Sequence, residues 1–376
     1  MKNIFRSALC IALCVPLLTS LCACASLKRL FGDYALQLGS VTMDEEIYAY
    51  YMSCYRPYWI YTFGEDDTEQ FWSSSSNGIT VSDYLQDVSL TAIKSKLVAE
   101  YLFSEYHLTL SDEKKAEVEA VIDGLLLGIG GREEFEKDEL MKQLGLTLDD
   151  MYDVFIADAK SAAVQDYLYG ETGKEIVTKD DRDTYYSNNY YRYKHLYIMD
   201  VDYVRDENGK IVFDSEGYAK WQEISDERWD EKFTHAQSLL QRAQNGEDFD
   251  DLIIENTEEL GFEKYLYGHY FNKQAVSSST YFSAISDQVM KMAENEVQLI
   301  RSEYGLHLLL RLPLDADGYK HTENGDDFKN FDEYVEEEKF KTKLQGYFDE
   351  IKVNEKVINK YRIDQVPYSE SWTYLF

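Results

Sequence analysis

Apolar residues recur at helical spacing along most of the chain beyond residue 40. Leu90, Ile93, Leu97 and Tyr101 lie three or four residues apart, so they fall on one face of a long helix that begins near Val81. The same kind of pattern predicts helices that start at Ser111 and that span residues 134–144, 147–169 and 226–244. The N-terminal half of the chain is therefore predicted to be almost wholly helical.

Polar, proline and glycine positions predict where these helices begin and end. The run Thr42-Met43-Asp44-Glu45 matches a capping box that would open the first helix. Pro57 is expected to end that helix, because proline disfavours the helical conformation in the residue before it. Residues 64–78 predict a loop. The glycine-rich run 124–131 predicts a hinge or turn, since no strand precedes it and no Gly-Lys-Ser/Thr follows it.

The pattern changes to that of strands in the middle of the chain. Residues 193–199 and 304–312 read as strands, and the second ends at Pro313. Between them, Asn208-Gly209 and Glu216-Gly217 mark turns on either side of a short strand at 210–213. Beyond Asp315 the helical pattern returns and includes Phe340, Leu344, Tyr347, Phe348 and Ile351. This last helix needs a partner surface, so we expect the strand-containing unit to be inserted between two parts of one helical domain.

The excess of acidic residues and the many tyrosines limit the kinds of molecule that the protein is expected to bind. The chain has 38 basic and 70 acidic residues and a formal charge of −32, which excludes a nucleic-acid binder. We expect this acidity to form a solvated surface that keeps the protein soluble; alternatively, it would repel the aggregation of polypeptides bound to the protein. The 32 tyrosines are mostly expected to pack in the interior, although a carbohydrate-binding or peptide-binding surface would also use them.

The first residues are typical of a secretory signal, with Lys2 and Arg6 ahead of an apolar run at 8–18. That run is shorter than the roughly 20 residues of a spanning helix. Leu21-Cys22-Ala23-Cys24 resembles the bacterial lipobox, which implies that residues 1–23 are removed and that Cys24 carries the lipid. The protein would then be anchored to the outer face of the cytoplasmic membrane. The alternative is an ordinary signal peptide with incidental cysteines.

Cleavage at this position would leave Cys54 as the one cysteine besides Cys24, so no internal disulfide is expected. Stability must then come from an apolar core. The length of the chain suggests two or three domains.

Four segments in this order resemble the PrsA/SurA-type extracytoplasmic foldases, which join a helical chaperone domain to a parvulin peptidyl-prolyl isomerase domain. They are Tyr185-Tyr186-Ser187-Asn188-Asn189, Lys194-His195-Leu196-Tyr197-Ile198, the run from Asn245 to Leu252, and Tyr304-Gly305-Leu306-His307-Leu308-Leu309.

The resemblance implies an α+β fold with a mostly helical SurA/trigger-factor-like chaperone domain and an inserted parvulin-like domain. The implied boundaries are a signal at 1–23, a helical domain at 24–190, an isomerase domain at 191–313 and a helical return segment at 314–376. The implied function is to bind unfolded or partly folded exported polypeptides and to isomerise their X-Pro bonds without a cofactor.

The resemblance also implies the site residues. Two facing histidines would be His195 and His307, an acid across the pocket would be Glu258, and a hydroxyl near the last strand would be Ser302. The proline pocket implied by the resemblance is formed by Tyr281, Phe282, Ile285 and Phe271.

Departures from the family pattern leave other functions open. The family's Gly-Gly-Asp-Leu-Gly-like turn corresponds to residues 264–271, which keep a single glycine. His195 and His307 would then be core histidines bonded to each other in a non-catalytic holdase. A solute-binding lipoprotein is a third alternative, but such proteins usually alternate strand and helix through two lobes.

A metal site is not expected. His107, His235, His269 and His321 lack the spacing of zinc ligands. Asp315-Ala316-Asp317-Gly318 places its glycine wrongly for a calcium loop and predicts a turn. The oligomeric state stays open.

Overall fold

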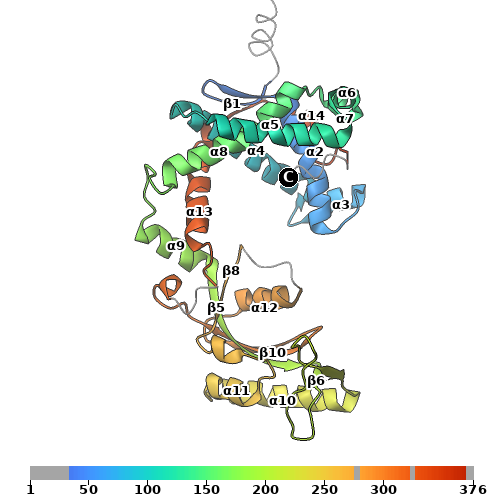
Figure 1. Cartoon of the computed structure of the whole chain (residues 1–376), viewed down its shortest axis with the longest axis vertical. Helices are drawn as coiled ribbons and strands as arrows, with labels where there is room; N and C mark the ends of the chain where they lie inside the picture. Colours follow the sequence, from blue (N-terminus) through green and yellow to red (C-terminus); the bar gives the residue numbers. More distant parts are fainter. Residues whose placement is uncertain (1–33, 275–279, 322–326, 370–376) are drawn as a thin grey trace, which may run out of the picture. The chain divides into compact units, whose positions relative to one another are not determined.

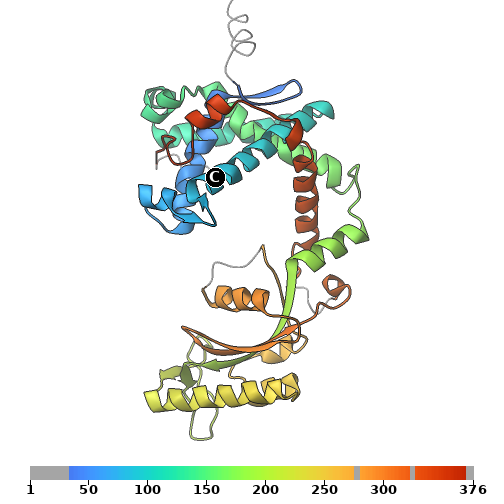
Figure 2. The same ribbon diagram turned by 180° about the vertical axis from the view of Figure 1, so that it is seen from behind.

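The protein has an α+β fold, as predicted from its sequence. A computed structural model describes residues 34–274, 280–321 and 327–369 (Figures 1 and 2). The chain divides into two compact units. One comprises Met1–Ile176 and Lys339–Phe376, and the other comprises Val177–Glu338. The second unit is thus inserted in sequence within the first. Cys24 lies outside the described residues.

The first unit is mainly helical. Its longest helices are α2 (Glu45–Phe63), α4 (Val81–Glu105), α5 (Asp112–Ile129) and α8 (Leu148–Tyr169). The shorter helices are α3 (Glu69–Ser73), α6 (Arg132–Lys137), α7 (Glu139–Leu144), the 3-10 turn η4 (Phe348–Glu350) and α14 (Glu355–Lys360). Helix α13 (Phe331–Gln345) ends in this unit.

Two small antiparallel sheets complete the first unit. The sheet β11-β1-β2 joins Tyr34–Leu38 (β1) and Val41–Asp44 (β2) to Lys352–Val353 (β11) near the other end of the chain. The hairpin of β3 (Ser75–Ser76) and β4 (Ile79–Thr80) follows α3.

Several predicted helix boundaries are confirmed. Helix α4 begins at Val81, and Ser111 caps α5 by accepting a hydrogen bond from the backbone N–H of Lys114. Helix α5 ends at Gly130, whose φ of 97° is in the left-handed region that glycine tolerates. The hinge or turn predicted for residues 124–131 is therefore wrong for Gly124 and Gly128, which lie within α5, and only Gly130 and Gly131 follow the helix end.

Two predictions near the start of this unit are wrong. Thr42 lies in β2 opposite Gln37, and Asp44 precedes α2 without a side-chain cap bond, so the predicted capping box does not form. Helix α2 also continues past Pro57 to Phe63. Proline removes one backbone donor, but the preceding turns of α2 are buried in the core, and we attribute the continuity of the helix to this packing.

The second unit is built on a four-stranded antiparallel sheet with the order β8-β5-β10-β9. Its strands are β8 (His269–Asn272), β5 (Tyr190–Met199), β10 (Gly305–Leu312) and β9 (Val297–Ser302). Its helices are α9 (Lys179–Asn189), α10 (Asp226–Gln244), α11 (Phe249–Asn256), α12 (Thr280–Lys291) and the 3-10 turns η1 (Phe262–Tyr265) and η2 (Gly318–Lys320).

Side-chain alternation gives this sheet two different faces. Leu196 and Leu308 pack with residues of α10 and α11 on one face. Tyr193 and Leu309 pack with Ile285 of α12 on the other face. Figure 2 shows α12 on the opposite side of the sheet from α10 and α11. Since His195 and His307 are two residues from Tyr193 and Leu309, they lie on the α12 face.

The connection from β5 to α10 is an elaborated loop. It holds the ribbon of β6 (Val201–Tyr203) and β7 (Trp221–Glu223). The predicted strand at 210–213 is wrong, because only the isolated bridges Arg205 to Ile211 and Phe213 to Ala219 form there. The predicted C-terminal helix is partly correct: α13 covers Phe340 and Leu344 but ends before the remaining apolar positions. Among the described helices, none is long and apolar enough to cross a membrane.

Candidate functional site

Two buried histidines meet on the α12 face of the four-stranded sheet. His195 of β5 and His307 of β10 are brought together by the antiparallel register, in which Tyr197 lies opposite His307 and His195 opposite Leu309. Nε2 of His195 is 2.9 Å from Nδ1 of His307. The structure therefore places the two predicted histidines in direct hydrogen-bonding contact.

A hydroxyl and a carboxylate extend this pair at its two ends. Oγ of Ser302, on β9, is 2.7 Å from Nε2 of His307. At the other end, Oε2 of Glu259 is 3.4 Å from Nδ1 of His195. Three strands and the loop after α11 thus contribute one polar row, Ser302-His307-His195-Glu259.

The donors and acceptors of this row have one consistent order when both imidazoles are neutral. An ionised Glu259 can only accept, so Nδ1 of His195 carries a proton and its Nε2 accepts from His307. Nε2 of His307 then accepts from the Ser302 hydroxyl. Ser302 in turn accepts the backbone N–H of Tyr304 at 3.0 Å. These tautomers are assigned from the network of partners.

Burial favours the neutral form of His307. His307 has no exposed surface and His195 is 6% exposed. Burial, and then the nearby charge of His195, lower the pKa of His307 to about 3. Burial acts to raise the pKa of Glu259, but the hydrogen bond from His195 and the charges of three histidines lower it overall. Glu259 is thus ionised at neutral pH.

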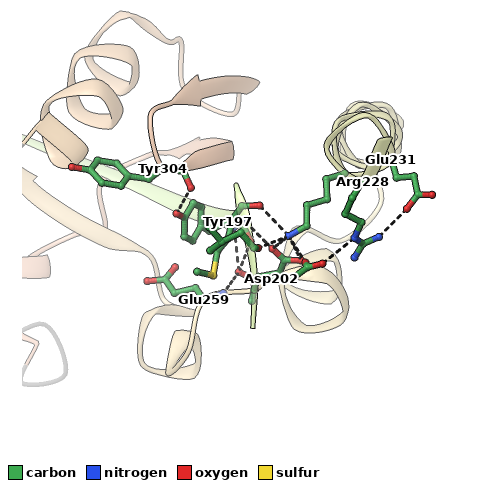
Figure 3. Close-up of polar contacts among 11 residues, drawn as sticks. Tyr197, Asp202, Arg228, Glu231, Glu259 and Tyr304 are labelled. Carbon is green, nitrogen blue, oxygen red and sulfur yellow. Dashed lines mark hydrogen bonds and ion pairs between the residues drawn. The ribbon is translucent and has the colours of Figure 1, made fainter. Parts of the chain in front are cut away.

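Aromatic rings cover the histidine pair. The ring of Tyr197 stacks on that of His307 with centroids 4.9 Å apart, and its hydroxyl donates to the carbonyl of Tyr304 at 2.6 Å (Figure 3). A third histidine, His269 on β8, stacks on Tyr265 at 4.2 Å, and burial lowers its pKa to about 4. His269 was not predicted to be a residue of the isomerase site. His269 lies two residues before the predicted pocket residue Phe271 on the same strand. This spacing could have indicated that both side chains face the same side of the sheet.

Glu258 does not join the histidines. Its carboxylate accepts the backbone N–H of Met199 at 2.7 Å and lies 2.8 Å from Nζ of Lys232. The loop after α11 runs along β5, because the backbone N–H of Glu258 donates to the carbonyl of Tyr197. Consecutive residues of such an extended segment face opposite ways, and Glu259 therefore points to His195. The structure thus brings Glu259, and not the predicted Glu258, into contact with the histidine pair.

The predicted proline pocket is only partly described. Ile285 is 1% exposed and packs against Tyr193 and Leu309 in the core. Phe271 is half-buried and stacks on Tyr191 at 5.4 Å. Tyr281 and Phe282 lie in the first turn of α12, and their side chains are outside what the structure describes. Phe271 and Ile285 thus lie on the same sheet face as the histidines, and Ile285 is part of the core.

A cavity of about 650 Å³ lies beside the row of polar groups. It is bounded by the β6–β7 ribbon and by the loop after α11, and Thr257, Glu258 and Glu259 line one wall. The histidines are not among its lining residues. Glu259, whose side chain is 26% exposed, is the group that faces both His195 and this cavity.

Within the described ranges, no cluster of His, Cys, Asp or Glu could hold a metal ion. Asp315 accepts a hydrogen bond from Tyr270 and pairs with Arg192. Gly318 opens the 3-10 turn η2. This segment is a turn held by side-chain contacts.

Comparisons with known proteins gave structural matches only. No family model matches the chain, and no curated protein matches it. Solved structures that it resembles include the peptidylprolyl isomerase PrsA from Bacillus anthracis, with 15% identity over 70% of this chain and 99% of that chain and a TM-score of 0.26. PrsA from Bacillus subtilis matches with 16% identity over 79% and 92% and a TM-score of 0.23. Foldase protein PrsA from Streptococcus pneumoniae matches with 12% identity over 76% and 96% and a TM-score of 0.22.

Proposed function

We propose that the protein is an extracytoplasmic foldase, anchored through Cys24 to the outer face of the cytoplasmic membrane, that isomerises X-Pro bonds of unfolded exported polypeptides. The observation that carries the proposal is the row Ser302-His307-His195-Glu259 on one face of the inserted sheet. Such a preorganised polar row is consistent with a catalytic role.

The chemistry requires no covalent step. Amide resonance opposes rotation about an X-Pro bond with a barrier of roughly 18–20 kcal/mol. The planar amide carries partial negative charge on its oxygen, and the twisted amide carries less. A carboxylate near that oxygen disfavours the planar form, so the twisted form is relatively stabilised. Glu259 is the ionised, partly exposed group that supplies this charge, and its contact with Nδ1 of His195 holds it in place.

A prolyl-peptide isomerisation assay tests this proposal. We expect His195→Ala, His307→Ala and Glu259→Gln each to lower kcat/KM at least about tenfold, which corresponds to about 1.4 kcal/mol of transition-state stabilisation. His235→Ala on α10 is the matched control, because His235 is exposed and distant in sequence from the site. A wild-type rate equal to the uncatalysed rate would rule out the isomerase function.

A non-catalytic holdase is the second candidate. It is favoured by the complete burial of His307 and by the placement of Ile285 in the core. Its test is the suppression of aggregation of an unfolded client. Full suppression by His195→Ala and His307→Ala, together with an absence of isomerase activity in the wild type, would favour the holdase.

The proposed location has a separate test. Cys24→Ala should abolish lipid labelling and release the protein from the membrane fraction. Unchanged membrane association would remove the anchor from the proposal.

A further inference from the structure

Exposed aromatic and acidic side chains gather where α2 passes into α3, in the helical unit. Tyr61 is 87% exposed, Phe63 is 53% exposed and Tyr58 is 47% exposed. Tyr58 and Tyr61 are one helical turn apart and therefore neighbours on the surface. The end of α2 and helix α3 project from the body of this unit (Figure 1). We call this surface the aromatic tip and define it by Tyr58, Tyr61, Phe63, Glu65, Asp66 and Glu69.

The aromatic tip rests on a firm base. The Phe63 ring lies 6.0 Å from that of Phe71, which is buried, and Trp59 donates to Ser89 of α4 at 3.0 Å. Asp67 is held by Arg56 at 3.0 Å and by the indole of Trp72. The exposed rings are therefore presented by a fixed scaffold.

The charges of the aromatic tip have one sign. Residues 57–93 contain no Lys, Arg or His. Among the described residues, Glu65, Asp66 and Glu69 form no ion pair, whereas Asp67 is paired with Arg56. A cation bound here would interact with the unpaired carboxylates by charge attraction and with the faces of the exposed rings by cation–π contact.

The negative charge and exposed rings of the aromatic tip limit which binding partners fit it. A second copy of the chain would bring acid against acid in a protein of charge −32, and nucleic acid or an anionic membrane would also be repelled. A flexible polypeptide with a basic residue beside apolar residues complements both the rings and the carboxylates.

We propose that the aromatic tip binds extended client segments in which Lys or Arg lies next to apolar residues. This inference rests on the proposed foldase function and specifies its client class. Binding at the aromatic tip requires neither proline nor the histidine row, so the two proposals can fail separately.

The test uses two fluorescein-labelled peptides without proline, equal in length and apolar content, with Lys in one replaced by Glu in the other. Fluorescence anisotropy should show tighter binding of the Lys peptide to the purified chain and a loss of this preference as salt rises. We expect Tyr61→Ala, and separately the combination Glu65→Gln, Asp66→Asn and Glu69→Gln, to weaken Lys-peptide binding roughly tenfold, or about 1.4 kcal/mol.

Matched controls make the outcome decisive. Tyr218→Ala and His235→Ala each remove an exposed side chain from the other unit; both should bind the Lys peptide like the wild type. Equal affinity for the two peptides, or an equal loss in Tyr218→Ala and Tyr61→Ala, would overturn the proposal. So would concentration-dependent self-association in sedimentation that Tyr61→Ala abolishes, since a second copy would then be the occupant.

Discussion

The histidine row and the aromatic tip differ in burial and in how far their polar groups contact one another. In the row, Glu259, His195, His307 and Ser302 hold one another and are largely buried. At the tip, Tyr61 lies almost fully exposed and the neighbouring carboxylates have no ion-pair partner among the described residues. A catalytic group must be held in one geometry before the substrate arrives. A surface that binds many different client sequences instead needs exposed aromatic rings and carboxylates that are not already in ion pairs. Substitutions should therefore cost stability near the row and binding at the tip.

The largest loss of stability is expected for Ile285→Ala. Ile285 of α12 is 1% exposed and packs against Tyr193 and Leu309 on the sheet face that also carries the histidines. Removing a buried isoleucine side chain typically costs about 2–5 kcal/mol. Urea unfolding should show this decrease in the free energy of unfolding. An unchanged midpoint with weakened proline-peptide binding would instead assign Ile285 to the substrate pocket.

A smaller loss is expected for Lys232→Met. Nζ of Lys232 contacts the carbonyls of Met199 and Val201 and the carboxylates of Glu258 and Asp202, and the residue is 4% exposed. Breaking a fully buried ion pair costs roughly 3–5 kcal/mol, but both carboxylates here remain partly solvated, so we expect about 1–3 kcal/mol.

Lys232→Met also tests whether the Glu258 contact positions its neighbour Glu259. Isomerase activity should fall together with stability, and the pH profile of the activity should shift because Glu259 is held less firmly. Arg228→Met, which removes a more exposed partner of Asp202, is the matched control. Loss of stability with an unchanged pH profile would limit Lys232 to a structural role.

Stability should fall with acid below about pH 6.5, the usual pKa of histidine. The folded-state pKa values of His269 and His307 are lowered to about 4 and about 3. The unfolded chain thus binds more protons over this window, and each histidine contributes a slope of at most about 1.4 kcal/mol per pH unit. Denaturation curves between pH 7 and 4 should show the decline, and His269→Gln should flatten it. A wild-type curve that is level across this window would contradict the buried neutral histidines.

The smallest effect on stability is expected for Tyr61→Ala. A side chain this exposed contributes little to folding, and substitutions at such positions usually change stability by less than about 0.5 kcal/mol. Thermal unfolding should leave the midpoint nearly unchanged while peptide binding weakens. A large fall in the midpoint would show that the aromatic tip is part of the core, and the contrast between the two regions would disappear.

The resemblance to the foldase family allowed much of the histidine row to be predicted, and strand alternation agrees with it. His195 and His307 lie on two apolar strands at positions that face the same side of the sheet, and Ser302 lies just before the second strand. Strand alternation does not extend into the loop after α11, so it could not predict which of two consecutive acidic residues contacts His195. Only the hydrogen bonds of that loop to Tyr197 and Met199 decide that Glu258 turns to Lys232 and Glu259 to His195.

Long-range pairing explains what else was missed in the fold. Leu36 of β1 pairs with Val353 of β11, and no local pattern indicates that two short segments so far apart in sequence form one sheet. Likewise, the local preference of Pro57 predicts a helix end, but tertiary packing of α2 overrides it. Local patterns thus found the long helices and both central strands, and non-local contacts decided the rest.

Exchange between the cis and trans forms of a proline peptide, followed by NMR at equilibrium, tests the central claim most directly. We predict that the wild-type chain accelerates exchange without changing the cis-to-trans ratio. His307→Ala and Glu259→Gln should each reduce the acceleration at least about tenfold, while Tyr61→Ala and His235→Ala should retain it. Exchange at the uncatalysed rate in the presence of the wild-type chain would contradict the assignment of the histidine row as an isomerase site.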